Sequence, residues 1–146
     1  MKTSNKGIEM IKGFETLHLK AYMCPAGHYT IGWGHTKGVT ATQHISLTQA
    51  EMFLSEDVKN AEVCVLKIPG LAQNQFDALV SFVFNVGVQA FENSTLRRLV
   101  IANRNDKAIA GEFIRWKYAT VGGRKVVLPG LERRRKAEAD MYIKKI

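Results

Sequence analysis

The sequence predicts an α+β fold, in which a small antiparallel sheet comes early and helices occupy the rest of the 146 residues. Two observations predict this order. From Leu19 to Val39, four glycines and one proline interrupt short segments of Tyr, Thr, Ile and Trp, which is typical of strands joined by tight turns. From Thr48 onwards, apolar residues recur at helical spacing. The length fits one domain, and the sequence has no internal repeat.

A short helix is expected before the sheet, with Ser4 or Asn5 as its cap. Three apolar residues follow at helical spacing: Ile8, Ile11 and Phe14. Glu15 therefore stands at the exit of this helix, directly before the segment that should form the sheet.

A long helix is expected after the sheet. Thr48 and Glu51 match a capping box, and the helix should end at Pro69 and Gly70. Its buried face is expected to hold Leu54, Val58, Ala61 and Val65. The next helix is apolar on almost every side and should lie at the centre of the core. Its apolar residues are Phe76, Leu79, Val80, Phe82, Val83 and Phe84.

Three further helices complete the prediction of a helical bundle. The first should be capped by Asn93 or Ser94, and the second should precede a turn at residues 122–123. The last should run over residues 131–145. The apolar residues of the first two are Leu96, Leu99, Val100, Ala108, Ile109, Phe113 and Trp116.

The formal net charge of +8 comes entirely from the last third of the chain. Residues 1–96 hold seven Lys and Arg against eight Asp and Glu, whereas residues 97–146 hold fourteen against five. A field of this sign attracts polyanions such as nucleic acid, anionic lipid headgroups or an acidic wall polymer. No helix-turn-helix, zinc or RNA-binding signature is visible, so nucleic acid is not expected as a partner.

The sequence shows no apolar run of the ~20 residues that a membrane span needs. The N-terminal segment also lacks the pattern of a cleavable signal peptide, so we expect synthesis in the cytosol. Two cysteines, Cys24 and Cys64, are too few for a disulfide framework or a zinc site. Both are expected to be free thiols, Cys64 in the core. No metal or other cofactor is expected, and the protein is expected to be a monomer.

Three reactive side chains surround the predicted sheet: Glu15, Cys24 and Thr30. A carboxyl packed against Phe14 or Leu17 would have its charged form disfavoured and could donate a proton at neutral pH. Glycoside hydrolysis needs such an acid and, across the scissile bond, a group that activates water. Thr30 and Cys24 can supply that second side, the thiol only as thiolate.

Each of these residues also has an ordinary structural interpretation. A glutamate at a helix end is usually solvated, cysteine is among the most buried residue types, and threonine is common in strands. Residue type alone leaves these alternatives open. Gly32 and Gly34 lack the lysine spacing of a phosphate-binding loop, so nucleotide binding is not predicted.

The spacing of the three residues adds a resemblance to a known family. The order is Glu15, eight residues, Cys24, five residues, Thr30 and then IGWGHT. This pattern is similar to the active-site signature of the phage-type lysozymes of glycoside hydrolase family 24, the endolysins that cut bacterial peptidoglycan. In that family the second position is Asp or, in some members, Cys. Further blocks follow in the family order: LTQAEMFLSEDV, SFVFNVG, FENSTLRR and RWKYATVGGRKVVLPGLERRRKAE. The resemblance covers nearly the whole chain.

This resemblance implies a lysozyme-like single domain over residues 1–146, with a cleft for the glycan between two lobes. A small sheet-containing lobe is expected at about 15–50 and a helical lobe at about 70–146 plus the N-terminal helix, with a long helix joining them. The implied reaction is hydrolysis of the bond between N-acetylmuramic acid and N-acetylglucosamine, which lyses the host cell.

The resemblance also implies a role for each residue. Glu15 would be the proton donor, while Thr30 with Cys24 would position the attacking water. We favour an inverting reaction because a hydroxyl and a thiol suit a covalent glycosyl role poorly. His35 is expected to form an ion pair with Asp57 on the long helix. Candidate glycan contacts are Phe84, Asn85 and Ser94, with core packing and helix capping as the alternatives.

The basic C-terminal helix has two interpretations. Arg133, Arg134, Arg135 and Lys136 alternate with Glu132, Glu138 and Asp140, which permits a solvated face with surface ion pairs. Alternatively, this helix binds the anionic wall or outer-membrane lipopolysaccharide, aided by an apolar side of Leu131, Met141, Tyr142 and Ile146.

For the whole protein, we favour a muramidase kept in the host cytoplasm until a separate membrane-permeabilising protein releases it to the periplasm. The alternative is a non-catalytic relative that only binds wall polymer.

Overall fold

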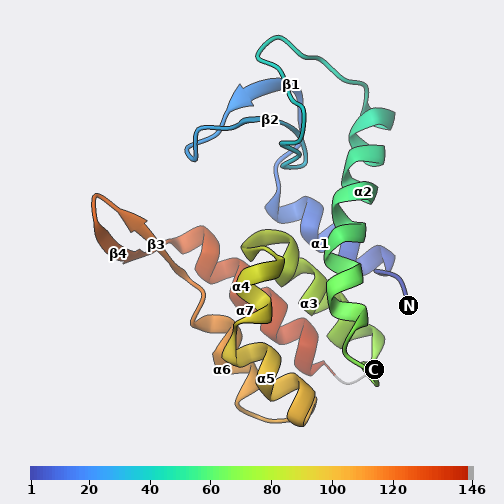
Figure 1. Cartoon of the computed structure of the whole chain (residues 1–146), viewed down its shortest axis with the longest axis vertical. Helices are drawn as coiled ribbons and strands as arrows, with labels where there is room; N and C mark the ends of the chain where they lie inside the picture. The colour runs from blue at the N-terminus through green and yellow to red at the C-terminus, as the bar shows by residue number, and fades with distance from the viewer. Residues whose placement is uncertain (145–146) are drawn as a thin grey trace.

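A computed structural model describes residues 1–144 of the chain. Its elements in order are α1 (Asn5–Phe14), β1 (His18–Met23), β2 (Tyr29–Gly32), α2 (Leu47–Leu66), α3 (Gln73–Val86), α4 (Val88–Glu92), α5 (Thr95–Ala102), α6 (Ile109–Ile114), β3 (Tyr118–Val121), β4 (Arg124–Val127) and α7 (Pro129–Ile143). Figure 1 shows the sheet of β1 and β2 beside one end of the long helix α2, while α3 to α7 gather around its other end. The predicted α+β class is confirmed.

The first helix forms as predicted and delivers Glu15 to the start of the sheet. The Ser4 hydroxyl caps α1 by accepting a hydrogen bond from the backbone N–H of Gly7. Glu15 follows the helix with an extended backbone, and its N–H donates to the carbonyl of Ile11 at 2.9 Å. Strand β1 then pairs antiparallel with β2, which places Tyr22 opposite Thr30.

The long helix α2 begins at a different cap from the one predicted. The capping box is formed by Ser46 and Gln49, whereas Thr48 and Glu51 already lie inside the helix. Ile45 is buried directly before the cap, so its anchoring in the core fixes where the helix starts. The predicted buried face is confirmed, but the helix ends at Leu66, ahead of the predicted Pro69.

Helix α3 is the centre of the core, as predicted. All residues from Gln75 to Val83 are buried, and α3 packs against α1, α2 and α7. Phe84, at the end of this run, is only half-buried. The buried Asp77 on α3 accepts hydrogen bonds from the backbone and hydroxyl of Ser4, which ties the N-terminal cap to the core.

Two elements were not predicted: the short helix α4 and the hairpin of β3 and β4. The hairpin has no alternating apolar pattern, because nearly all its residues are exposed on both faces. Its register depends on the turn at Gly122 and Gly123, which both have positive φ values of 56° and 78°. The prediction that helices use the whole second half of the chain is therefore wrong.

The final helix starts at Pro129, earlier than predicted, and ends at Ile143. The predicted end at Lys145 lies outside the described residues. Over residues 1–144, no helix combines the length and the apolarity that crossing a membrane requires.

Candidate active site

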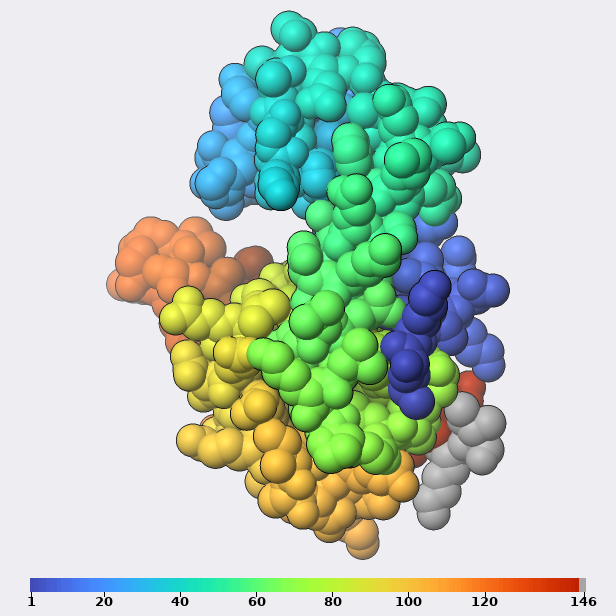
Figure 2. Space-filling view, turned by 45° about the vertical axis from the view of Figure 1, so that its right-hand side comes forward, coloured from blue at the N-terminus to red at the C-terminus, as the bar shows by residue number. Residues whose placement is uncertain are grey.

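The surface is hollowed between the sheet of β1 and β2 and the hairpin of β3 and β4 (Figure 2). A pocket there is lined by Glu15 at the end of α1, Asn85 at the end of α3, Leu128 and Pro129 before α7, and Arg134 within α7. Three helices that are distant in sequence thus bring polar side chains to one place.

The carboxyl group of Glu15 lies between α7 and the turn after β2. Its Oε1 atom accepts a hydrogen bond from Arg134 Nη1 at 2.8 Å. Its Oε2 atom lies against Gly34, where an added Cβ would come within 2.9 Å of it. The Glu15 side chain is 22% exposed. From the sequence we considered packing of this carboxyl against Phe14 or Leu17, and the sequence did not reveal that a buried cation, Arg134, binds it.

Cys24 and Thr30 come together at the open end of the sheet. Cys24 directly follows β1, and its backbone N–H donates to the His28 carbonyl at 2.9 Å. Hydrogen bonds from the His28 backbone and, second, from the Thr30 side chain lower the pKa of the partly exposed Cys24 thiol. The buried Thr30 hydroxyl also lies 3.1 Å from the His28 carbonyl. A hydroxyl has one proton, so it donates either to this carbonyl or to the Cys24 thiolate.

Tyr22 on β1 lies opposite Thr30 in the strand register. Burial raises the pKa of its phenol, and the negative charges of Cys24 and Glu15 raise it further.

The sequence did not reveal the charge network behind Glu15. Arg134, Arg135 and Glu138 on α7 are 3%, 0% and 0% exposed. The prediction of a solvated or lipid-binding face is therefore wrong for these three residues. Burial lowers the pKa of the Arg135 guanidinium, yet arginine stays protonated in proteins. The sequence signal for this network was the spacing of Glu138 from Arg135 (i, i+3) and from Arg134 (i, i+4). Exposed ion pairs on helices have the same spacing, so the signal does not indicate burial.

Glu132, Arg133 and Lys136 of α7 agree with the surface interpretation. Glu132 lies 3.8 Å from Lys136 Nζ and 3.7 Å from Lys117 Nζ. Arg133 and Lys136 are exposed, while Tyr142 is buried. Ile146, part of the predicted apolar side, lies outside the described residues.

The predicted ion pair between His35 and Asp57 is confirmed. His35 Nδ1 lies 2.8 Å from Asp57 Oδ2, and Nε2 lies 3.0 Å from the Lys37 carbonyl. The imidazole stacks on Phe53 with 4.2 Å between ring centroids. Both ring nitrogens are used, so His35 fixes the turn after β2 to α2. Cys64 is 3% exposed, which confirms its predicted place in the core.

The three candidate glycan contacts lie in different surroundings. Asn85 lines the pocket that contains Glu15, and Phe84 lines a neighbouring pocket that contains Gly34. Ser94 is 4% exposed and caps α5. Its hydroxyl donates to the Phe91 carbonyl at 2.6 Å and accepts from the Arg97 N–H at 3.1 Å. Helix capping therefore accounts for the hydrogen bonds of Ser94.

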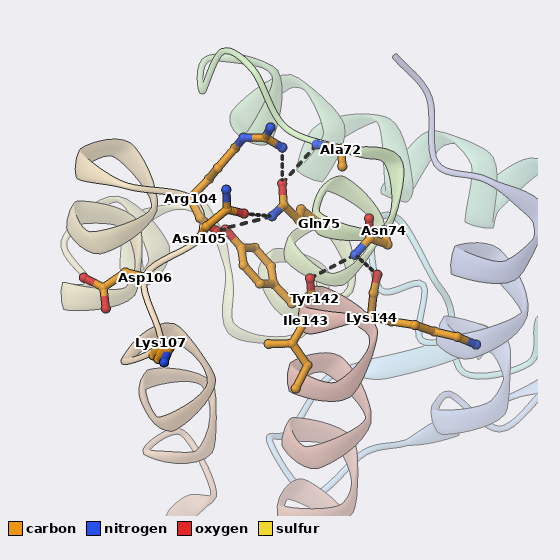
Figure 3. A pocket seen from close by; sticks show the side chains of 10 residues that line it. All are labelled: Ala72, Asn74, Gln75, Arg104, Asn105, Asp106, Lys107, Tyr142, Ile143 and Lys144. Atoms are coloured by element: carbon orange, nitrogen blue, oxygen red, sulfur yellow. Dashed lines mark hydrogen bonds between the residues drawn. The ribbon is translucent and has the colours of Figure 1, made fainter. Parts of the chain in front are cut away.

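Another pocket lies where α3, the loop before α6 and the end of α7 meet (Figure 3). Its polar groups bind one another. Gln75 bonds to the Arg104 guanidinium at 3.0 Å, and the Tyr142 hydroxyl donates to the Arg104 carbonyl at 2.7 Å. Burial raises the pKa of Tyr142 to about 12. The Asn74 amide donates to backbone carbonyls at the end of α7. These contacts join three elements of the fold.

Among residues 1–144, no group of three or more His, Cys, Asp and Glu side chains is placed to hold a metal ion.

The fold defines a lysozyme-like protein, with a small sheet, a helical body and a pocket that Glu15 lines. The chain matches the Phage lysozyme family over residues 12–138. An endolysin of Acyrthosiphon pisum secondary endosymbiont phage 1 is 43% identical over 97% of this chain and 98% of its own length. An endolysin of Bacillus phage PZA is also 43% identical, but the match spans only 55% of that longer protein.

Solved structures agree with this assignment. The muramidase domain of SpmX from Asticaccaulis excentricus superimposes with a TM-score of 0.92 at 36% identity, covering 99% of both chains. The endolysin from Escherichia coli O157:H7 phage FAHEc1 gives 0.91 at 38% identity, covering 100% of this chain and 96% of its own. The chain therefore belongs to the phage lysozyme family.

Proposed function

We propose that the protein hydrolyses the bond between N-acetylmuramic acid and N-acetylglucosamine in peptidoglycan, with Glu15, Cys24 and Thr30 as its catalytic residues. The enzyme class follows from the family: it is a glycoside hydrolase, a phage endolysin that acts on peptidoglycan. The Glu-Cys-Thr set and the assignment to glycoside hydrolase family 24 are our proposal. The observation that carries it is the position of Glu15 in the pocket, fixed by Arg134 at 2.8 Å, and the lowered pKa of Cys24 beside Thr30 supports it.

The proposed mechanism gives the two oxygens of Glu15 different tasks. Oε1 is held by Arg134, so Oε2 beside Gly34 is the oxygen that donates the proton to the leaving sugar. Because Gly34 has no side chain, a sugar can approach this oxygen closely. The fixed carboxyl is oriented before the substrate arrives, which lowers the entropic cost of reaching the transition state.

Cys24 and Thr30 would act on the water. The lowered pKa of Cys24 increases its thiolate fraction, and a thiolate can accept a proton from the attacking water. Thr30 can donate to that thiolate or hold the same water. We propose inversion, with water attacking from the side opposite the leaving group.

We also propose how the parts of the chain and its partners serve this reaction. Residues of about 15–50 would form a small lobe, and those of about 70–146 with α1 a large one, as a monomer. The enzyme would remain in the host cytoplasm until a separate protein opens the membrane. Exposed cations on α7, Arg133 and Lys136, would attract the anionic wall or lipopolysaccharide. Replacing both by glutamate should weaken binding to lipopolysaccharide vesicles and flatten its salt dependence.

Substitution of Glu15 by glutamine tests the catalytic proposal. We expect Glu15→Gln to lose lysis of peptidoglycan suspensions by about 1,000-fold, because an amide cannot donate the proton. The folded fraction should be measured by circular dichroism in the same samples. Mass spectrometry of the wild-type products should find reducing N-acetylmuramic acid ends. A folded Glu15→Gln enzyme that still lyses would disprove the assignment, and a wild type that binds the wall without cleaving it would favour a wall-binding protein.

A further inference from the structure

Glu138 on α7 joins the two arginines behind the hollow. It is 0% exposed. Its Oε2 atom accepts hydrogen bonds from Arg134 Nε at 3.3 Å and from the Ser81 hydroxyl at 2.6 Å, while Oε1 accepts from Arg135 Nη1. One buried carboxylate thus holds both guanidinium groups from behind, each through a different oxygen.

The first guanidinium, that of Arg134, extends from this carboxylate to Glu15. While Nε binds Glu138, Nη1 donates to Glu15 at 2.8 Å and Nη2 donates to the Ser81 carbonyl at 3.2 Å. All three nitrogens of the planar fork are used. The position of the Glu15 carboxyl is therefore tied to that of Glu138.

The second guanidinium, that of Arg135, extends to Asn85. Its Nε donates to the Trp116 carbonyl at 3.1 Å, and its Nη2 donates to Asn85 Oδ1. Arginine only donates hydrogen bonds, so the oxygen of the Asn85 amide must face it. The NH2 group of this exposed amide then points the other way, in a pocket that it lines together with Glu15.

We propose that Glu138 is a positioning residue that fixes two groups at once: the Glu15 carboxyl, through Arg134, and the Asn85 amide, through Arg135. This inference rests on the proposed role of Glu15. The four charges balance, since two buried arginines face Glu138 and Glu15. Glu138 thereby sets the distance between the proton donor and a hydrogen-bond donor for the sugar.

A glutamine at position 138 cannot accept hydrogen bonds from both arginines in the way that the carboxylate does. Its amide has a single acceptor oxygen, so it can serve one arginine, while its NH2 group would face the other arginine with donor against donor. A buried donor without an acceptor is costly, so one guanidinium must move. Movement of Arg134 displaces Glu15 and slows the chemical step, whereas movement of Arg135 releases Asn85 and weakens sugar binding.

A purely structural role for Glu138 makes a different prediction. An enzyme that is only destabilised contains fewer folded molecules, so its apparent kcat falls while its KM stays that of the wild type. A change in KM, together with kcat expressed per folded molecule, therefore separates positioning from stability.

The experiment compares Glu138→Gln with Glu132→Gln, which makes the same chemical change at a surface ion pair of the same helix. Release of reducing ends from soluble, uncross-linked peptidoglycan gives kcat and KM, and circular dichroism gives the folded fraction. We expect Glu138→Gln to raise KM about tenfold and to lower kcat per folded molecule about tenfold, since hydrogen bonds to charged groups are involved. Glu132→Gln should change neither.

A double-mutant cycle with Asn85→Ala tests the second connection. If Glu138 acts on KM through Asn85, the double variant should have a KM no higher than the larger of the two single variants. Glu138→Asp keeps the charge but is one carbon shorter, so we expect intermediate values. Should the glutamine variant fail to fold, the aspartate variant carries the same KM test.

Wild-type KM and wild-type kcat per folded molecule in both Glu138 variants would overturn the proposal, and so would fully additive KM effects with Asn85→Ala. Glu15→Gln is measured alongside. Activity of folded Glu15→Gln would show that the proposed role of Glu15 fails, whereas an inactive Glu15→Gln with an unaffected Glu138→Gln would show that only the positioning role fails.

Discussion

The two sides of the hollow are built in opposite ways. On the helical side, Glu15 is held by Arg134, which is itself locked into a fully buried network with Glu138. On the sheet side, Cys24 is partly exposed and is oriented by the backbone of a tight turn and by Thr30. The acid is positioned by buried charge, and the thiol by local hydrogen bonds.

This difference predicts how each side responds to mutation. Buried charges depend on one another, so removing one leaves another without a partner in a medium of low polarity. An exposed thiol can be changed at little cost to folding, because water replaces its contacts. Damage to the helical side should therefore affect stability and activity together, whereas damage on the sheet side should affect activity alone.

Arg134→Met should have the largest effect. It removes the cation between Glu15 and Glu138, so we expect a loss of about 3–5 kcal/mol in the free energy of unfolding, measured by urea denaturation. Arg133→Met is the matched control, because Arg133 is an exposed neighbour on the same helix. Its cost should stay within about 0.5 kcal/mol. Similar losses in both variants would mean that the buried network contributes little.

Cys24 should come next, with an effect on activity and none on stability. We expect Cys24→Ser to lose about 100-fold in kcat, because a hydroxyl is a much weaker base, and Cys24→Asp to retain activity. Alkylation of the native enzyme should inactivate it. Cys64 serves as the internal control, since burial raises the pKa of its thiol and hides it from reagents. Full activity after alkylation at Cys24, located by mass spectrometry, would remove the thiol from the mechanism.

Gly34→Ala tests the contact between the turn after β2 and the carboxyl group of Glu15. Residue 34 has a φ of +81°, and an added methyl group would lie 2.9 Å from Glu15 Oε2. We expect a loss of about 1–3 kcal/mol from backbone strain and a marked loss of activity. Gly38→Ala should show similar strain without the activity loss, because its φ is +69° and no atom lies within 4 Å of the added group. Equal activity in the two variants would contradict the contact with Glu15.

Thr30→Val should give the smallest effect, a change in the titration of Cys24. The wild-type rate of alkylation at Cys24 should rise with pH and level off above a midpoint below the ordinary thiol value of 9.0, since hydrogen bonds favour the thiolate. Removing the Thr30 hydroxyl should move that midpoint upwards. The His28 backbone hydrogen bond remains, so the pKa should stay lowered. A midpoint that does not move would show that Thr30 does not stabilise the thiolate.

Much of the fold could be predicted because local signals and core pattern agreed. Ser4, the apolar residues of α3 and the glycines of the sheet each indicated the element that forms there. The prediction failed at the start of α2, where Ser46 caps the helix and Thr48 lies inside it. It also failed for the β3–β4 hairpin, whose exposed strands carry no alternation for a pattern to detect.

The sequence by itself determined the α+β order, the spacing of Glu15, Cys24 and Thr30, and the pairing of His35 with Asp57, because each depends on residues close in sequence or on a family pattern. Only the tertiary structure decided which arginines of α7 are buried. Arg133 and Arg134 are adjacent arginines, yet Arg133 is exposed and Arg134 is buried. The difference arises because the Arg134 side chain points at α3 and the end of α1. Burial is a property of how helices pack, and Glu15 lies 119 residues from the arginine that holds it.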